Sequence, residues 1–181
     1  MKWKVIASEY LFNEPWLTVR KDKCELPNGH VMPAFYVSEY PTWVTALALT
    51  KDNKVVMVKQ YRHGIEDVSI ETPGGVVEEG EDSIAAIKRE VKEETGYEFE
   101  SIEFLGKVSA NPSTHNNYLH MFLLKGGEKV AAQKLDETED LEVVLYTIDE
   151  LKKLVKENKI IQSLHVSCIF YALNKLELIR W

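Results

Sequence analysis

Three glutamates close together in the sequence, Glu90, Glu93 and Glu94, form the most distinctive group of chemically active side chains. On a helix each residue advances by about 100°, so the three carboxylates fall within one arc of about 100°. An apolar stripe borders this arc, and Glu94 falls at the rim of the stripe. The stripe consists of Ile84, Ile87 and Val91. Clustered carboxylates suit a hard divalent cation, because Mg2+ prefers oxygen ligands and keeps several of its own waters.

An acidic helix face that simply meets water is the alternative interpretation of the same pattern. Solvated helices usually mix charge signs, whereas Glu90 has like-charged neighbours at Glu93 and Glu94, each costing about 0.2–0.5 kcal/mol. An unpaired carboxylate at the rim of a core is also costly. A bound cation removes both penalties, but spacing alone leaves the two interpretations open.

A glycine pair before the acidic segment offers a way to complete a metal site. Gly74 and Gly75 have no Cβ, so the backbone there can approach a ligand closely. A carbonyl oxygen from this loop can therefore join the carboxylates as a ligand. On the other side of the carboxylate arc, the helix pattern places Arg89.

The elements that must position these groups are strands early in the chain and helices later. Asp82 or Ser83 can cap a helix that runs to about Thr95, where Gly96 ends it. Pro73–Gly75 predicts a loop that interrupts regular structure. The predicted strands cover 16–20, 31–40, 43–50, 55–62, 99–108, 118–124 and 141–147, and the late helices cover 148–156 and 163 to about 178. This order predicts an α+β fold, not alternating βαβ units.

Composition excludes several classes of function. The formal net charge is −7, and no Lys/Arg cluster forms the basic patch of a general nucleic-acid binder. No apolar run reaches the length of a membrane span, and the first residues lack the apolar segment of a secretory signal. Cys24 and Cys168 form no disulfide framework, so we expect a cytoplasmic protein. We predict a boundary near Tyr40–Pro41, between an N-terminal β region (1–41) and a main domain (42–181).

The segment from Gly75 to Tyr97 resembles the Nudix box. That box is Gly, five residues, Glu, seven residues, then Arg-Glu-aliphatic-x-Glu-Glu-x-Gly-aliphatic. Every fixed position is matched at the right spacing, and the one departure is Tyr97 in place of an aliphatic residue. So many fixed positions make a bland acidic helix a poor explanation. The resemblance implies a Nudix hydrolase, in which mixed β-sheets lie between helices, here with an N-terminal antiparallel β appendage.

Carried over by position, the box implies a metal site and its support. Glu90 and Glu94 would bind Mg2+, with Mn2+ as the alternative, and Glu93 would lie at the same site. The Gly74 carbonyl would be a further ligand. Glu81 would pair with Arg89 and, with Gly75, hold the loop against the helix. Metal-ion catalysis then implies attack of water on a diphosphate.

Flanking residues resemble the ADP-ribose pyrophosphatase branch of the family. Gln60-Tyr61-Arg62 is similar to that branch's motif, in which the arginine contacts the substrate diphosphate. Glu71-Thr72-Pro73-Gly74-Gly75 is similar to its Glu-Leu-Pro-Ala-Gly-Gly loop, with Thr72 in place of an apolar residue. Pro112 resembles the proline that marks ADP-ribose hydrolysers, and His115 lies in the same loop. Glu71, Pro112 and His115 are therefore predicted, with Arg62, to contact the substrate. The resemblance implies hydrolysis of ADP-ribose, or a related nucleotide sugar, to AMP and a sugar phosphate by a homodimer.

The general base is the least determined assignment. In this branch a glutamate on a late loop often has that role, and the acidic segment before residue 141 matches it. Glu139 is the first candidate, Glu137 the second, and Glu93 the alternative within the box. Two other functions stay open: a (deoxy)nucleoside triphosphate or dinucleotide pyrophosphatase, and a ligand-sensing domain without turnover. The sensing domain is disfavoured because this chain keeps all the box glutamates.

Overall fold

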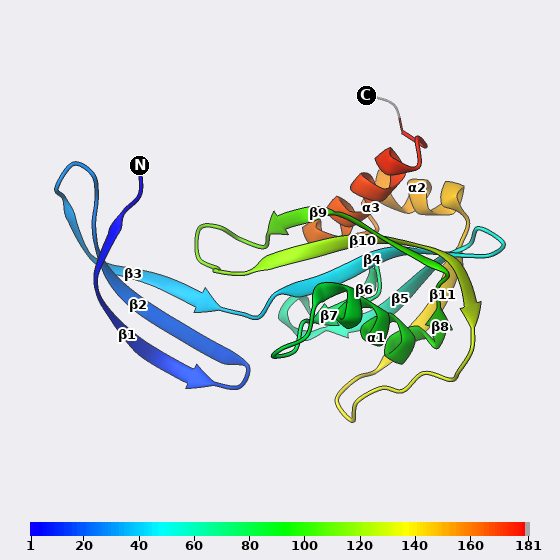
Figure 1. The fold of residues 1–181 in the computed structure, drawn as a ribbon, viewed down its shortest axis with the longest axis horizontal. Coiled ribbons are helices and arrows are strands. Elements are labelled where there is room, and N and C mark those ends of the chain that lie inside the picture. The colour runs from blue at the N-terminus through cyan, green and yellow to red at the C-terminus, as the bar shows by residue number, and fades with distance from the viewer. Residues whose placement is uncertain (180–181) are drawn as a thin grey trace. The chain divides into compact units, whose positions relative to one another are not determined.

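The computed structural model describes residues 1–179, whose backbone contacts divide into two compact units. The first unit comprises Met1–Pro41 together with Ser109–Tyr118, and the second comprises the rest of the described chain. The predicted α+β class is confirmed: an antiparallel sheet at the N-terminus is followed by a mixed sheet with helices (Figure 1). Within the described residues no helix is both long enough and apolar enough to cross a membrane.

The first unit is a three-stranded antiparallel sheet in the order β1-β2-β3. Its strands are β1 (Lys4–Glu14), β2 (Leu17–Glu25) and β3 (Val31–Glu39). Every residue of β1 is exposed, which explains why an alternating burial pattern did not predict this strand. The segment Ser109–Tyr118 joins the sheet through hydrogen bonds from the Ser38 N–H to the Thr114 carbonyl at 2.7 Å and from the Tyr40 N–H to Asn116 Oδ1 at 3.0 Å.

The second unit is built on an eight-stranded mixed sheet whose main path is β11-β5-β4-β10-β8. The central pair, β4 and β10, is parallel, while β5 pairs antiparallel with β4, β6 and β11. The strands are β4 (Trp43–Thr50), β5 (Val55–Arg62), β6 (Asp67–Glu71), β7 (Gly74–Val76), β8 (Tyr97–Glu98), β9 (Ser101–Ser109), β10 (Tyr118–Lys129) and β11 (Leu141–Tyr146), with a 3-10 turn η1 (His63–Ile65).

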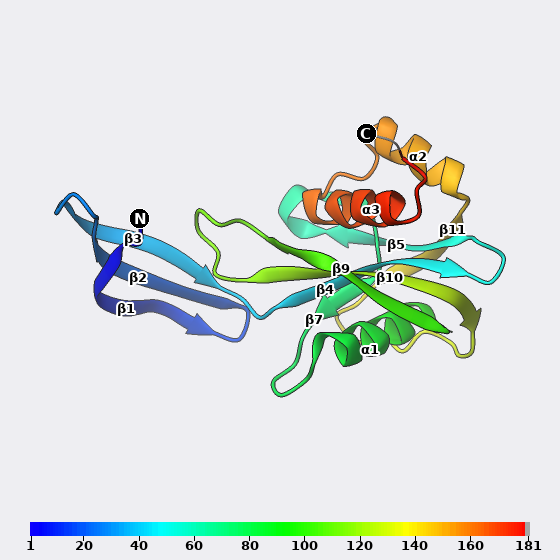
Figure 2. The ribbon, with the colours of Figure 1, turned by 45° about the horizontal axis from the view of Figure 1, so that its top comes forward.

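Helices cover both faces of this sheet, with α1 (Ser83–Thr95) on one side and α2 (Ile148–Lys156) and α3 (Ser163–Lys175) on the other (Figure 2). Successive side chains of a strand point to opposite faces. Leu47 and Leu49 accordingly pack with residues of α2 and α3, whereas Ala46 and Ala48 pack with α1. Burial on both faces fixes β4 as the centre of the core, and β4 carries the backbone against which the candidate site is built.

Local signals set the ends of α1 as predicted. The Asp82 side chain accepts hydrogen bonds from the Ile84 and Ala85 N–H groups, and Gly96 ends the helix with φ +76°. Two other predictions were wrong. The segment expected as a loop contains β7, which pairs with β4, and α3 ends at Lys175 rather than near residue 178.

Candidate functional site

The core face of α1 carries a carboxylate in its middle. Ala86, Ile87, Val91 and Thr95 are buried, and Glu94 lies among them with 7% of its surface exposed. Because each helical residue advances by about 100°, these buried residues place the centre of the buried face near Glu94. Ile84 lies away from this centre and is 49% exposed. This corrects the expectation that Ile84 belongs to the buried stripe and that Glu94 lies only at its rim. Glu90 is also half-buried, with 12% of its side chain exposed.

The backbone of β7 holds two of the α1 carboxylates. The Gly74 N–H donates to Glu94 Oε2 at 2.9 Å, and the Val76 N–H donates to Glu90 Oε1 at 3.1 Å. Gly75 lies between these donors, and a Cβ there would overlap the Glu90 carboxylate. A Cβ on Gly74, whose φ is +156°, would overlap the Val44 carbonyl of β4. The glycine pair thus allows β7 to lie between β4 and the acidic helix.

Burial perturbs the titration of both carboxyl groups. The pKa of Glu94 is raised to about 8, first of all by removal from water; the Gly74 N–H opposes the rise, while the charges of Glu90, Glu139 and Glu71 add to it. Burial also raises the pKa of Glu90, with Arg89 opposing it. Two buried carboxyl groups at one point of the fold are costly to ionise without a cation. The donor set therefore fits a hard divalent metal.

Arg89 supplies positive charge to this group. It donates to both oxygens of Glu81, from Nε at 3.1 Å and from Nη2 at 2.9 Å, and to the Val76 carbonyl at 3.0 Å. Its Nη1 donates to Glu90 at 2.9 Å and to Glu93 at 3.2 Å. The pKa of Arg89 is raised, first by Glu81. The expected Glu81–Arg89 pair is therefore formed, and the same guanidinium also relieves the repulsion between Glu90 and Glu93.

The three glutamates share a neighbourhood without converging on one point. Glu90 and Glu93 turn toward Arg89, and Glu94 turns toward the Gly74 N–H. Among residues 1–179 no group of three His, Cys, Asp or Glu side chains is arranged to hold a metal ion. Metal binding by this set therefore requires the side chains of Glu90 and Glu93 to turn away from Arg89.

Arg62, at the end of β5, is held by a buried carboxylate. Its Nε donates to Glu71 Oε1 at 2.9 Å and its Nη2 to Glu71 Oε2 at 2.5 Å, a bidentate pair. The Arg62 side chain is 47% exposed while that of Glu71 is 2% exposed. Burial alone would raise the pKa of Glu71, but Arg62 and then His165 outweigh it and hold the pKa well below its usual range. Glu71, expected to contact substrate, thus lies behind Arg62 with almost no surface for a ligand.

A line of buried polar groups continues from Glu71 to the short segment, Thr72 and Pro73, that leads into β7. His165 of α3 places Nε2 3.1 Å from Glu71 Oε2 and Nδ1 2.7 Å from Thr72 Oγ1. Thr72 Oγ1 lies 2.7 Å from Thr45 Oγ1, which is 3.0 Å from the Pro73 carbonyl. Sequence reasoning missed His165 and Thr45. The available signal was Thr72, a polar residue where the related loop has an apolar one.

The candidate base Glu139 lies in a loop that is tied to the C-terminal end of α1. The Gln133 side chain donates to the Glu94 carbonyl at 2.7 Å, and the Lys134 N–H donates to the Glu93 carbonyl at 2.8 Å. Glu139 is half-buried and is among the charges that raise the pKa of Glu94, whereas Glu137 is exposed. The structure thus brings Glu139 into the field of the α1 carboxylates.

Pro112 and His115 belong to the first unit. Pro112 is exposed, while His115 is half-buried and its ring lies 5.0 Å from that of Tyr40, measured between centroids. The backbone N–H of His115 donates to the Asn111 carbonyl at 2.7 Å. The structure thus places both residues with the N-terminal sheet.

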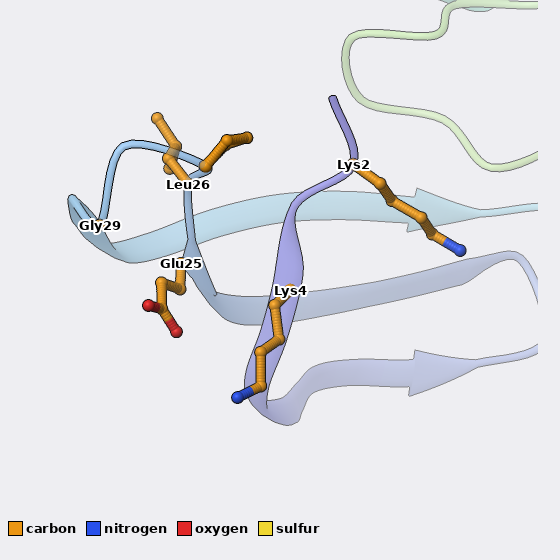
Figure 3. Close-up of a pocket in the computed structure, with 6 residues that line it drawn as sticks. Lys2, Lys4, Glu25, Leu26 and Gly29 are labelled. Carbon is orange, nitrogen blue, oxygen red and sulfur yellow. The ribbon is translucent and has the colours of Figure 1, made fainter.

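An open depression of about 370 Å³ also lies on the first unit (Figure 3). Its lining consists of Lys2, Lys4, Glu25, Leu26, Pro27 and Gly29. None of the predicted site residues lines it.

Comparison with known proteins matches both parts of the chain. The NUDIX domain matches residues 40–164, and the nucleoside diphosphate sugar hydrolase N-terminal domain matches residues 3–38. The chain is 36% identical over 169 residues to the methanol dehydrogenase activator of Bacillus methanolicus and 31% identical over 169 residues to the ADP-ribose pyrophosphatase of Bacillus subtilis (strain 168). Each alignment covers 93% of this chain and 91% of the relative.

The fold is similar to that of a solved ADP compounds hydrolase. The TM-score is 0.86 at 22% sequence identity, and the superposition covers 98% of this chain and 95% of that one. At this identity the likeness bears on the fold alone.

Proposed function

The chain belongs to the Nudix hydrolase family, and from this premise we propose that it hydrolyses the diphosphate of ADP-ribose or a related nucleotide sugar to AMP and a sugar phosphate. The observation that carries the proposal is the position of half-buried Glu90 and buried Glu94, two carboxylates that the β7 backbone holds on the same side of the sheet core. The printed activity of the B. subtilis relative, ADP-ribose pyrophosphatase, supports the choice of substrate.

We propose that Glu90, Glu93, Glu94 and the Gly74 carbonyl hold Mg2+, with Mn2+ as the alternative. The donor set is all oxygen, as these cations prefer. The raised pKa of Glu94 reflects a need for positive charge that Arg89 does not meet, since Arg89 donates to Glu90 and Glu93 but not to Glu94. When bound, the metal neutralises phosphate oxygens and lowers the pKa of water.

The protein's own groups have distinct tasks in this scheme. Arg62 binds the substrate diphosphate with the exposed part of its guanidinium, while Glu71 fixes the orientation of that guanidinium. Glu139 accepts the proton of the attacking water; Glu137 and Glu93 are the alternatives for this step. Glu81, Arg89 and Gly75 keep β7 against α1. Pro112 and His115 stay predicted substrate contacts.

The test is hydrolysis by the full chain of a panel of nucleotides at equal concentration with Mg2+, Mn2+ or EDTA. The panel contains ADP-ribose, other ADP sugars, diadenosine polyphosphates, NAD and nucleoside triphosphates, and products are separated by ion-exchange chromatography. We expect AMP and ribose 5-phosphate from ADP-ribose, and no product in EDTA. Faster turnover of triphosphates or dinucleotides than of any ADP sugar would replace this proposal by the alternative pyrophosphatase. Binding of ADP-ribose without turnover of any compound would favour a ligand-sensing domain.

We also propose that the protein is a cytoplasmic homodimer that associates through the N-terminal sheet. The first unit exposes large apolar side chains on all three strands, with Trp16 89% exposed at the β1–β2 turn. The others on this sheet are Trp3, Val5, Ile6, Tyr10, Leu11, Phe12, Leu17, Val31 and Tyr36. An apolar surface of this kind marks an interaction site, and the unpaired edge of β1 can accept another strand.

Light scattering after size exclusion measures the association directly. For the wild type we expect a mass about twice the 20.8 kDa of one chain. For Phe12→Asp we expect the mass of a single chain. The matched control is Val130→Asp, which changes an apolar residue of similar exposure in the second unit. A wild-type mass of one chain contradicts the dimer.

A further inference from the structure

His165 stands between two groups to which the proposed function gives different tasks. On one side is Glu71, which holds Arg62; on the other is Thr72, which leads to the loop before Gly74. We propose that His165 is a positioning residue that sets Arg62 and this loop relative to each other. The inference rests on the proposed function, because that function makes Arg62 the diphosphate contact and the Gly74 carbonyl a metal ligand.

Close polar contacts connect His165 to the segment before Gly74. Thr45 Oγ1 lies 3.0 Å from the Pro73 carbonyl oxygen and 2.7 Å from Thr72 Oγ1. Thr72 Oγ1 lies 2.7 Å from His165 Nδ1. Because a threonine hydroxyl can both donate and accept, this contact can form with either tautomer of His165. The line of hydrogen-bonding groups thus runs from α3 to the carbonyl of the residue before Gly74.

The second contact of His165 reaches the arginine. Its Nε2 lies 3.1 Å from Glu71 Oε2, a close polar contact that does not meet the geometry of a hydrogen bond. The same Oε2 accepts from Arg62 Nη2 at 2.5 Å. Glu71 is 2% exposed, so its carboxylate has no water to replace either partner. A shift of Glu71 therefore moves the guanidinium that it holds.

The environment of His165 distinguishes positioning from simple packing. The residue is 9% exposed, and its neighbours on the same helix face, Cys168, Ile169 and Ala172, are buried and apolar or nearly so. An apolar side chain would fill this space at least as well but would leave Thr72 Oγ1 and Glu71 with one partner fewer. Loss of a hydrogen-bond partner leaves a buried polar atom unsatisfied, which costs free energy. His165 thus supplies Thr72 with a polar contact on an otherwise apolar helix face.

Two substitutions separate the two contacts. The amide nitrogen of Asn matches the position of Nδ1, and the longer Gln reaches toward the position of Nε2. His165→Asn therefore keeps the donor to Thr72 and loses the contact with Glu71, whereas His165→Gln does the reverse. Thr72→Val removes the loop contact from its other end. His120→Asn is the matched control, because His120 Nδ1 also lies 2.7 Å from a hydroxyl, that of Ser83, away from Arg62 and the loop.

The measured quantities are the KM for ADP-ribose and the Mg2+ concentration that gives half-maximal activity. We expect His165→Asn to raise the KM about tenfold with the Mg2+ requirement within about twofold of wild type. His165→Gln and Thr72→Val should raise the Mg2+ requirement about tenfold and leave the KM within about twofold. His120→Asn should change neither. Equal shifts of both quantities in every variant, or a lower melting temperature with unchanged kinetics, would overturn the proposal.

A second readout separates failure of this inference from failure of the proposed function. Mg2+-induced thermal stabilisation is measured without substrate for the same full-length variants, whose folding is checked by circular dichroism. If the wild type hydrolyses no ADP-ribose but is stabilised by Mg2+, only the substrate assignment fails. His165→Gln and Thr72→Val should then still need about tenfold more Mg2+ for the same stabilisation, and His165→Asn should not. An identical Mg2+ response in all variants contradicts the role of His165.

Discussion

Replacing Glu94 by Gln should make the metal-free protein more stable and the enzyme inactive. Glu94 is 7% exposed, and burial raises its pKa from 4.5 to about 8. The direction of the stability change follows from the fact that the folded state favours the protonated form of Glu94. Because the folded-state pKa lies above the unfolded one, the fold is penalised when the group must ionise, and the penalty grows as the pH rises from 4.5 to about 8. Gln keeps an oxygen for the Gly74 N–H but carries no charge.

The size of the effect follows from the same shift. Each pH unit between the two pKa values costs the folded state about 1.4 kcal/mol, so the penalty at pH 7 is about 3 kcal/mol. At pH 5 it falls to below about 1 kcal/mol. Glu94→Gln removes this penalty. In saturating Mg2+ the order should reverse, because a ligand at about 1,000 times its Kd stabilises the wild type by about 4.1 kcal/mol, more than the penalty at pH 7, and the variant lacks a ligand carboxylate.

Urea unfolding in EDTA between pH 5 and pH 8, followed by circular dichroism, measures the difference in free energy of unfolding. The matched control is Glu98→Gln, which removes a charge from an exposed glutamate just beyond the end of α1. The control should show no growing difference between pH 5 and pH 7. A Glu94→Gln variant that is less stable than wild type at pH 7 in EDTA, or a difference independent of pH, would refute the reasoning.

Three further changes have defined outcomes. Gly75→Ala places a Cβ on the Glu90 carboxylate and should lower kcat by ~100-fold while circular dichroism stays unchanged; near-normal turnover contradicts the role of β7. Arg62→Lys cannot form the bidentate pair with Glu71 and should raise the KM for ADP-ribose about tenfold more than it lowers kcat, as steady-state kinetics will show. Burial raises the pKa of the Cys168 thiol to about 12, so a thiol reagent at pH 8 should label it only after unfolding; fast labelling of the native protein contradicts this.

The sequence predicted the parts of the site whose signals are local. The turn residues around α1 and the spacing of its carboxylates lie within one short segment, so Asp82, Gly96 and the Glu81–Arg89 pair could be located before the fold was known. The sequence pattern misplaces the centre of the buried face, because apolar spacing alone includes Ile84 in the stripe. Ile84 is the second residue of α1, in its first turn, and it stays 49% exposed.

The remaining parts depend on contacts between distant residues. His165 lies 93 residues from Thr72, and nothing in its own helix indicates a polar partner. β7 was predicted as a loop because glycines usually interrupt strands, yet here they allow close contact with β4 and with Glu90. β1 has no buried side, so no alternation indicates its strand conformation.

The excursion of residues 109–118 into the first unit imposes an order on biosynthesis. The N-terminal sheet leaves the ribosome first, but the partner of the Tyr40 N–H, Asn116, is synthesised 76 residues later. The separation is the same for β4 and β10, because Trp43 of β4 pairs with Leu119 of β10. The first unit therefore cannot complete its backbone pairing before Asn116 emerges, and β4 of the second unit cannot complete its pairing with β10 before Gly127 emerges. Nascent chains arrested before that point should remain protease-sensitive, and this dependence couples the two units during translation although each has its own internal contacts.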